Sequence, residues 1–218
     1  MSETSRASLS LDANLLWDNH WNAVKTRQMA STGQEEALWR AGGRATKENP
    51  NKEDGQWWDK NGRQMVQNWI DWRDQSHGLQ MWTTPNGEPA IELVVNISLN
   101  DVPIKMALDR VMVTQAGELV VVDLKTGKNT PSSDFQLGIY AVGMEIVFGK
   151  RPKYGTYWSA REGKLTELKP LDRWSIETVT NIVTQFDKAR REGIFVPNFD
   201  HCKMCNFVSV CKYQQGEM

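Results

Sequence analysis

Two β-rich segments separated by one short turn constrain the fold of this 218-residue chain more than any other feature. The segments are Ile104–Val113 and Glu118–Leu124, and Gln115-Ala116-Gly117 lies between them. Short runs of β-branched residues on both sides of a glycine turn are typical of an antiparallel hairpin. With the turn centred on Ala116, Asp109 lies directly opposite Asp123.

The two facing aspartates predict a bound cation. Directly opposed residues have Cβ atoms roughly 4.5–5.5 Å apart, and two carboxylates at that separation repel unless a proton or a cation lies between them. Both aspartates interrupt apolar strands, where a lone carboxylate is costly. Oxygen ligands suit Mg²⁺ or Mn²⁺, which can polarise a phosphate and activate a water.

Lys125 adds a third charged group to this face. Side chains alternate along a strand, so Asp123 and Lys125 share a face while Leu124 points away. A lysine here can position a water or offset charge on a phosphorane. The alternative is a salt bridge that stabilises the hairpin, which is common and weak, but the facing Asp109 favours the metal site. Gln136 and Tyr140 are four residues apart on the next predicted helix, and therefore on one of its faces.

The remaining segments predict an α/β fold. Residues 1–80 are rich in tryptophan and mainly helical in pattern, whereas β-prone segments dominate from Pro89 onwards. We expect a central mixed β-sheet flanked by helices, with an N-terminal helical lobe over 1–88 and a core over 89–218 that form one compact unit. The further strands and helices predicted are Ala90–Leu99, Ser133–Phe148, Lys153–Ala160, Lys164–Leu168 and Arg173–Glu192.

Three short motifs together resemble the RecB-type nucleases of the PD-(D/E)XK superfamily. They are Leu108-Asp109-Arg110, Val122-Asp123-Leu124-Lys125-Thr126-Gly127 and Gln136-Leu137-Gly138-Ile139-Tyr140. That group includes the nuclease domains of RecB and AddB and the CRISPR-associated RecB-family exonuclease. The resemblance implies a restriction-endonuclease-like core, a DNA substrate and a metal-dependent exonuclease.

The resemblance also implies a role for each matched residue. Asp109, Asp123 and the backbone carbonyl of Leu124 would bind the catalytic metal, and Lys125 would be the catalytic lysine. Gln136 and Tyr140 match a Gln-x-x-x-Tyr motif that holds DNA and the site, and Glu92 matches an acidic position on the preceding strand. The family's upstream Gly-x-x-x-His pattern is not met, because Gly62-Arg63-Gln64-Met65-Val66-Gln67 contains no histidine.

The three cysteines of the chain, Cys202, Cys205 and Cys211, lie within ten residues of one another. An odd, clustered set argues against a disulfide framework and favours a metal or cluster site. Their spacing resembles the C-terminal part of the iron–sulfur motif of AddB and the CRISPR-associated exonuclease, which implies a 4Fe–4S cluster. The N-terminal cysteine of that motif is absent, and His20 lies near its position. A Cys₃His zinc site completed by His201, or no site, is the alternative.

Composition and charge limit the function classes that remain. The content of 39% hydrophobic and 24% charged residues predicts a packed globular core, and a polar N-terminus without a long apolar run predicts a soluble, cytoplasmic protein with no membrane contact. Residues 1–124 carry a net charge of −5 and residues 125–218 of +4. We therefore expect DNA phosphates to contact the basic half, through Lys128, Lys150, Arg151 and Lys153.

Three functions are compatible with these features. The first is a DNA exonuclease acting in recombination, repair or DNA processing. The others are a catalytically weak nucleic-acid-binding module of the same fold and a structure-specific endonuclease. Because no glycine-rich phosphate-binding loop is present, unwinding of DNA would require a helicase or recombination partner.

Overall fold

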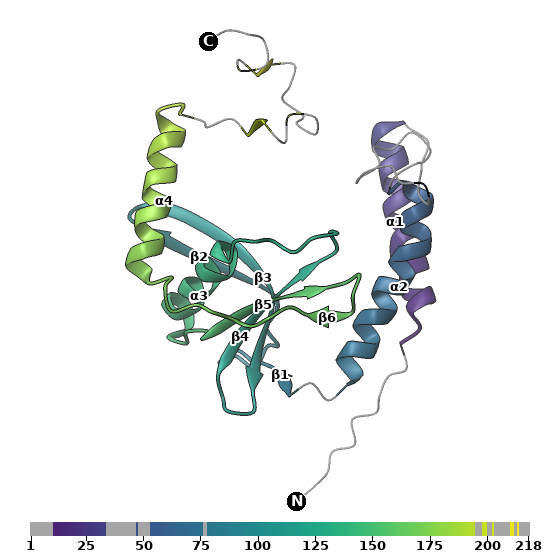
Figure 1. The fold of residues 1–218 in the computed structure, drawn as a ribbon, viewed down its shortest axis with the longest axis horizontal. Helices are drawn as coiled ribbons and strands as arrows, with labels where there is room; N and C mark the ends of the chain where they lie inside the picture. The colour runs from purple at the N-terminus through teal and green to yellow at the C-terminus, as the bar shows by residue number, and fades with distance from the viewer. Residues whose placement is uncertain are drawn as a thin grey trace, which may run out of the picture.

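The computed structural model describes residues 11–33, 47, 53–75 and 78–194, together with six positions nearer the C-terminus, 198, 199, 202, 210, 211 and 213. Its described elements form one mixed sheet with helices on both faces (Figure 1). In chain order they are α1 (Ala13–Thr32), α2 (Gly55–Asp74), β1 (Leu79–Met81), β2 (Ile91–Leu99), β3 (Val102–Thr114), β4 (Leu119–Lys125), α3 (Phe135–Phe148), β5 (Tyr154–Ser159), β6 (Lys164–Leu165), β7 (Lys169–Pro170) and α4 (Ile176–Arg191).

The predicted hairpin is formed by β3 and β4, and its register is confirmed. Arg110 pairs with Val122 and Val113 pairs with Leu119 across the antiparallel ladder. The turn closes through Gly117, whose φ of 80° suits a residue without a Cβ atom. The ladder ends at the pair Arg110 and Val122, one residue before Asp109 and Asp123.

The sheet runs in the order β1-β3-β4-β5-β6, with β2 also paired to β3 and β7 to β5. Among the described strand pairs, only β4 and β5 are parallel, and α3 makes the crossover between them. Val121 and Tyr157 pack against α3 on one face of the sheet, whereas Val122 and Trp158 pack against α2 on the other. The predicted class, a mixed α/β sheet flanked by helices, is confirmed.

The N-terminal helices are held to the sheet by specific contacts. Asp54 caps α2 by accepting a hydrogen bond of 2.9 Å from the Trp57 amide, and Asn68 donates to the Ala160 carbonyl at 2.8 Å. Helix α1 packs closely on α2, because a Cβ atom at Gly62 would lie 1.9 Å from the Trp17 ring. No described helix has the length and apolar character that a membrane span needs.

Two details differ from the predicted elements. The sheet begins at β1, which pairs with β3 through Leu79 and Thr114, although Leu79–Met81 fall within the range 1–88 predicted as a helical lobe. The second strand pair is shorter than predicted, because β6 covers only Lys164–Leu165 and a separate β7 pairs with β5. Both are short edge pairings that depend on a distant partner strand rather than on local pattern.

Candidate active site

Asp109 and Asp123 lie on neighbouring strands and are linked through the backbone of β4. The Leu124 amide donates a hydrogen bond of 2.7 Å to Asp109 Oδ2. Asp123 is only 3% exposed, whereas Asp109 is half-buried. The hairpin therefore presents two carboxylates at the end of β4, one of them almost fully removed from water.

Lys125 is fixed by three contacts on the same face of the sheet. Its Nζ atom lies 2.6 Å from Asp123 Oδ2, donates to Gln136 Oε1 at 3.1 Å and lies 5.5 Å from the centre of the Tyr157 ring. The side chain remains 26% exposed. The ammonium group is thus held in one place while part of it stays accessible to a ligand.

Gln136 and Tyr140 extend this network onto α3, as their helical spacing predicts. Gln136 Nε2 donates to Tyr140 Oη at 2.8 Å, while Gln136 Oε1 accepts from Lys125. Burial raises the pKa of Tyr140, and the charges of Asp123 and Asp109 act in the same direction. The phenol therefore stays neutral and able to donate a hydrogen bond.

Burial raises the pKa of Asp123, and the ion pair with Lys125 opposes that effect. The neighbouring charge of Asp109 raises the pKa of Asp123 further. Asp123 Oδ2 makes no conventional hydrogen bond besides this ion pair. The site therefore has an excess of negative charge that one lysine does not fully compensate.

These carboxylates fit a hard divalent cation. Mg²⁺ usually takes one or two carboxylates and completes its shell with water, so Asp109, Asp123 and the Leu124 carbonyl make a sufficient protein contribution. Within the described part of the chain, no group of three His, Cys, Asp or Glu side chains is placed to hold a metal. Water and substrate oxygens would therefore have to supply the remaining ligands.

Glu92 does not join this group of side chains. It lies opposite Asp109, because Ile91 pairs with Arg110 and Leu93 with Leu108, but it is exposed and its charge acts on the pKa of Arg110 rather than on that of Asp123. Glu92 thus lies on the strand next to Asp109, and its role in the site stays a prediction.

The backbone is kinked where Glu92 and Asp109 meet. Glu92 has a φ of 48°, which is uncommon for a residue with a side chain. Leu108 and Val111 both pack in the core beneath α3 and α4, although residues three apart in a regular strand face opposite sides. The strand therefore departs from regular alternation between Leu108 and Val111, next to Asp109, and such distortions are common beside active sites.

Tyr157 belongs to the site but was missed from the sequence. It pairs with Asp123 in the parallel ladder, as Ser159 does with Lys125. Its hydroxyl donates to the Ser133 carbonyl at 2.8 Å, and burial, with the charges of Asp123 and Asp134, raises its pKa to about 12. Tyr157 supports Lys125 and ties β5 to the segment before α3. Local pattern carries no signal for it, because its relation to Asp123 depends on a parallel pairing across α3.

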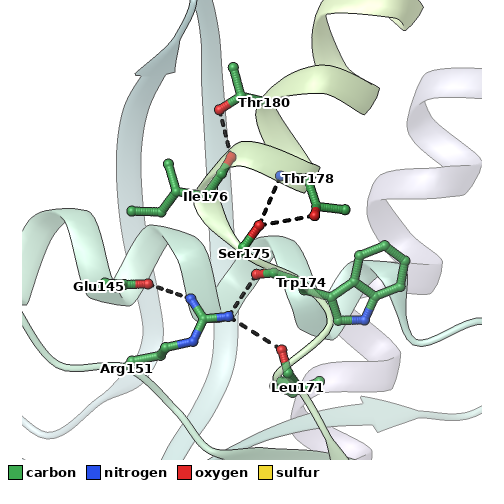
Figure 2. Close-up of polar contacts among 8 residues, drawn as sticks. All are labelled: Glu145, Arg151, Leu171, Trp174, Ser175, Ile176, Thr178 and Thr180. Atoms are coloured by element: carbon green, nitrogen blue, oxygen red, sulfur yellow. Dashed lines mark hydrogen bonds and ion pairs between the residues drawn. The ribbon is translucent and has the colours of Figure 1, made fainter.

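The basic residues divide into two groups. Lys128 follows β4 directly, near the carboxylates, whereas Lys153 precedes β5 and pairs with Glu118 at 2.5 Å, at the opposite end of the strands. Arg151 forms an ion pair with Glu145 and donates to the Leu171 and Trp174 carbonyls at 3.3 and 2.6 Å (Figure 2). Arg151 thus fixes the segment before α4, and the contribution of Lys150, Arg151 and Lys153 to DNA binding stays a prediction.

The cysteine segment lies largely outside the described residues, including Cys205 and His201. Cys202 and Cys211 are described as free and half-buried, and the Cys202 thiol contacts the Asn198 carbonyl at 3.8 Å. His20 is exposed on α1. The predicted cluster therefore remains a prediction from residue spacing.

Comparisons with known proteins agree with this geometry. The model of the family described as the PD-(D/E)XK nuclease superfamily matches residues 17–212. The Gene 69 protein of Mycobacterium phage D29 is 36% identical over 157 residues, which cover 69% of this chain and 57% of that protein. The Gene 69 protein of Mycobacterium phage L5 is 32% identical over 176 residues, which cover 69% of this chain and 60% of that protein.

The chain thus spans less than two thirds of the length of these phage relatives. Among solved structures, the crystal structure of SSO0001 aligns with 92% of this chain and 81% of its own, at 13% identity. The TM-score of that alignment is 0.42.

Proposed function

Because the chain belongs to the PD-(D/E)XK nuclease superfamily, we propose that it is a metal-dependent deoxyribonuclease whose active site is formed by Asp109, Asp123 and Lys125. One observation carries this proposal. The ammonium group of Lys125 is shared between the buried Asp123 carboxylate and Gln136, beside a second carboxylate on the facing strand.

Each residue has a defined task in the proposed reaction. Asp109, Asp123 and the Leu124 carbonyl would hold Mg²⁺ or Mn²⁺, which polarises a phosphate and lowers the pKa of a bound water. Lys125 offers its accessible ammonium to the phosphate oxygens, where charge increases during hydrolysis. Gln136 and Tyr140 keep Lys125 oriented, so it need not reorganise during the reaction.

For the substrate and mode of action, we propose exonucleolytic digestion of linear DNA in recombination, repair or DNA processing, with a helicase or recombination protein as partner. A second candidate function, a nucleic-acid-binding module with weak catalysis, is favoured by one observation. The upstream helix carries no histidine, and Gln67, the polar residue at the end of the corresponding motif, donates its amide to Asp71 at 2.7 Å. A structure-specific endonuclease is the third candidate.

A nuclease assay tests the proposal. Wild-type protein should degrade end-labelled linear DNA with Mg²⁺ or Mn²⁺ and not with EDTA, and should leave circular DNA intact. Asp109→Ala, Asp123→Ala and Lys125→Ala should each abolish cleavage while retaining the wild-type circular dichroism spectrum, because each removes part of the charge arrangement. Gln136→Ala and Tyr140→Phe should lower kcat less, since both act through Lys125.

The exposed Asp74→Ala variant, at the end of α2, serves as the matched control and should keep full activity. Full activity in Asp123→Ala would contradict the proposed site. Wild-type protein that binds DNA without cutting it would identify the binding module, and cleavage of circular DNA would identify the endonuclease.

We also propose that Cys202, Cys205 and Cys211 bind a 4Fe–4S cluster, with His20 as the candidate fourth ligand. Soft thiolates suit iron–sulfur clusters or zinc, and Cys202 and Cys211 are free thiols. This proposal rests on the spacing of the three cysteines and is independent of the nuclease site, because the two share no residues. Zinc remains the alternative metal.

A further inference from the structure

A small polar cavity opens at the ends of β4 and β5, beside the proposed active site. It has a volume of about 260 Å³, and the side chains that give it its chemistry are those of Lys128, Asn129, Thr130, Ser159, Lys164 and Thr166. Pockets for whole small molecules usually occupy about 300–1,000 Å³. The cavity therefore suits a chemical group such as a phosphate better than a complete nucleoside.

The position of the cavity relates it directly to Lys125. Ser159 pairs with Lys125 in the parallel ladder, and the Ala160 amide donates to the Lys125 carbonyl at 2.9 Å. Side chains of paired residues in adjacent strands share a face, and such strands lie about 4.8 Å apart. The cavity therefore begins one strand away from the carboxylates, on the same face of the sheet.

The charges of the cavity favour an anion. Lys128 is exposed in the segment after β4, and Lys164 on β6 is 70% exposed with its Nζ atom 2.9 Å from Glu162 Oε2. The hydroxyl group of Ser159 and the amide of Asn129 add hydrogen-bond donors, whereas the Thr166 hydroxyl is already bonded to Thr156 and to the Tyr157 amide. Glu162 is the one acidic residue in the lining, and it partly neutralises Lys164.

We propose that this cavity binds a phosphate of the nucleic-acid strand next to the phosphate that is cut, an inference that rests on the proposed nuclease function. Adjacent phosphates of one DNA strand are joined by a single sugar unit, and β4 and β5 lie about 4.8 Å apart, so the long side chains of Lys128 and Lys164 can reach the phosphate next to one held over β4. A strand whose scissile phosphate lies over β4 thus brings a neighbouring phosphate over β5 and the cavity. Lys128 and Lys164 bind that phosphate, and Glu162 limits the affinity.

The opposite end of β5 supplies a matched control. Lys153, like Lys164, is an exposed lysine, 51% exposed, and is also paired with a glutamate, Glu118. It lies six residues before Ser159, about 20 Å away along an extended strand. The same substitutions in the Lys164–Glu162 pair and in the Lys153–Glu118 pair therefore change the net charge equally, but at opposite ends of β5.

DNA binding should be measured by fluorescence anisotropy in EDTA, with labelled single-stranded and duplex oligonucleotides. Lys128→Ala and Lys164→Ala should each raise the Kd about five- to tenfold. For duplex DNA, each should also reduce the slope of log Kd against log salt by about 0.9, because one phosphate contact is lost. Glu162→Gln should lower the Kd, whereas Lys153→Ala and Glu118→Gln should leave it unchanged.

Two results would overturn the proposal: an unchanged Kd in both Lys128→Ala and Glu162→Gln, or an equal change in the Lys153 and Glu118 controls. Oligonucleotides with 5′-phosphate and 5′-hydroxyl ends identify the source of the phosphate. If Lys128→Ala and Lys164→Ala lose affinity for both oligonucleotides, the cavity binds an internal phosphodiester. If they lose affinity only for the 5′-phosphorylated oligonucleotide, it binds a terminal phosphate. Because no metal is present, these outcomes do not depend on cleavage. Missing nuclease activity with the expected Kd changes would refute the nuclease proposal alone.

Discussion

At the scale of single residues, the main feature of the site is that the negative charge of Asp123 is only partly balanced by positive charge. The carboxylate is almost fully buried, its ion pair with Lys125 is shared with Gln136, and Asp109 adds a like charge nearby. Removing an ionised carboxylate from water is costly unless it is paired. The unbound protein therefore carries a local destabilisation that a divalent cation would relieve.

The raised pKa of Asp123 predicts a pH-dependent stability. The folded protein retains this proton at pH values where the unfolded chain, with an ordinary value of 3.8, has released it. The free energy of unfolding therefore decreases as the pH rises from that ordinary value through the raised pKa. Asp123→Asn should lack this decrease and be the more stable protein near neutral pH, as urea unfolding in EDTA between about pH 4 and pH 8 would measure.

Added Mg²⁺ or Mn²⁺ should stabilise the wild-type protein, because the ion binds the folded state, and should not stabilise Asp123→Asn. The exposed Asp172→Asn variant is the control and should follow the wild-type curves. A metal-free Asp123→Asn protein that is less stable than wild type at every pH would show that Asp123 contributes to stability instead.

At the scale of elements, one arginine connects the N-terminal helices to the edge of the site. Arg161, just after β5, makes a two-pronged ion pair with Glu53 at 2.9 Å and donates to the Thr126 carbonyl at 2.8 Å. Its guanidinium group also lies 4.7 Å from the centre of the Trp57 ring. Helix α2 and the segment that follows Lys125 are thereby fixed to the same side chain.

Arg161→Ala should lower the free energy of unfolding by about 2–4 kcal/mol, because several charge-assisted hydrogen bonds and a cation–π contact are lost. It should also reduce kcat, since the Thr126 carbonyl loses its partner next to Lys125. Arg161→Lys should recover little of the lost stability and kcat, because an ammonium group cannot form the two-pronged contact. Glu53→Gln should lower the free energy of unfolding by less than Arg161→Ala does. A double-mutant cycle measured by urea unfolding should show coupling between Arg161 and Glu53. Additive effects would contradict a direct connection.

At the scale of the whole molecule, the two faces of the sheet carry different tasks. Helices α1 and α2 lie on one side and α3 and α4 on the other (Figure 1). The face beneath α3 carries the carboxylates, Lys125 and the polar cavity proposed to bind a phosphate. The tryptophan-rich face beneath α2 provides packing through Trp69, Trp72 and Trp158. The proposed cysteine cluster would add a connection between distant parts of the chain.

The cysteine cluster leads to a prediction about composition and stability. Protein prepared without oxygen should be brown and contain about four iron atoms per chain. Cys202→Ala, Cys205→Ala and Cys211→Ala should each lose the iron and lower the melting temperature, because the C-terminal segment loses its anchor. Iron content and visible absorption measure the first effect. His20→Ala should weaken the cluster, whereas the control His201→Ala should not. One zinc per chain without iron would contradict the iron assignment and support the Cys₃His alternative.

The core of the candidate site could be predicted from sequence because its geometry is local. A single turn sets the hairpin register, so the position of Gly117 is enough to bring Asp109 and Asp123 to neighbouring positions at the end of the ladder, and strand alternation then adds Lys125. The helical repeat likewise places Gln136 and Tyr140 on one face. Each of these placements involves residues that are close in sequence, and it follows from the regular backbone geometry of one hairpin or one helix.

Only the tertiary structure decided which distant groups complete the site. Tyr157, Ser159 and the cavity reach it through the parallel pairing of β4 with β5, whose register is set by packing around α3. The positive φ of Glu92 and the structural role of Arg151 were equally hidden from local pattern. Long-range pairing depends on how apolar faces pack together and on where buried polar groups find partners, and neither is encoded by residue spacing within one segment.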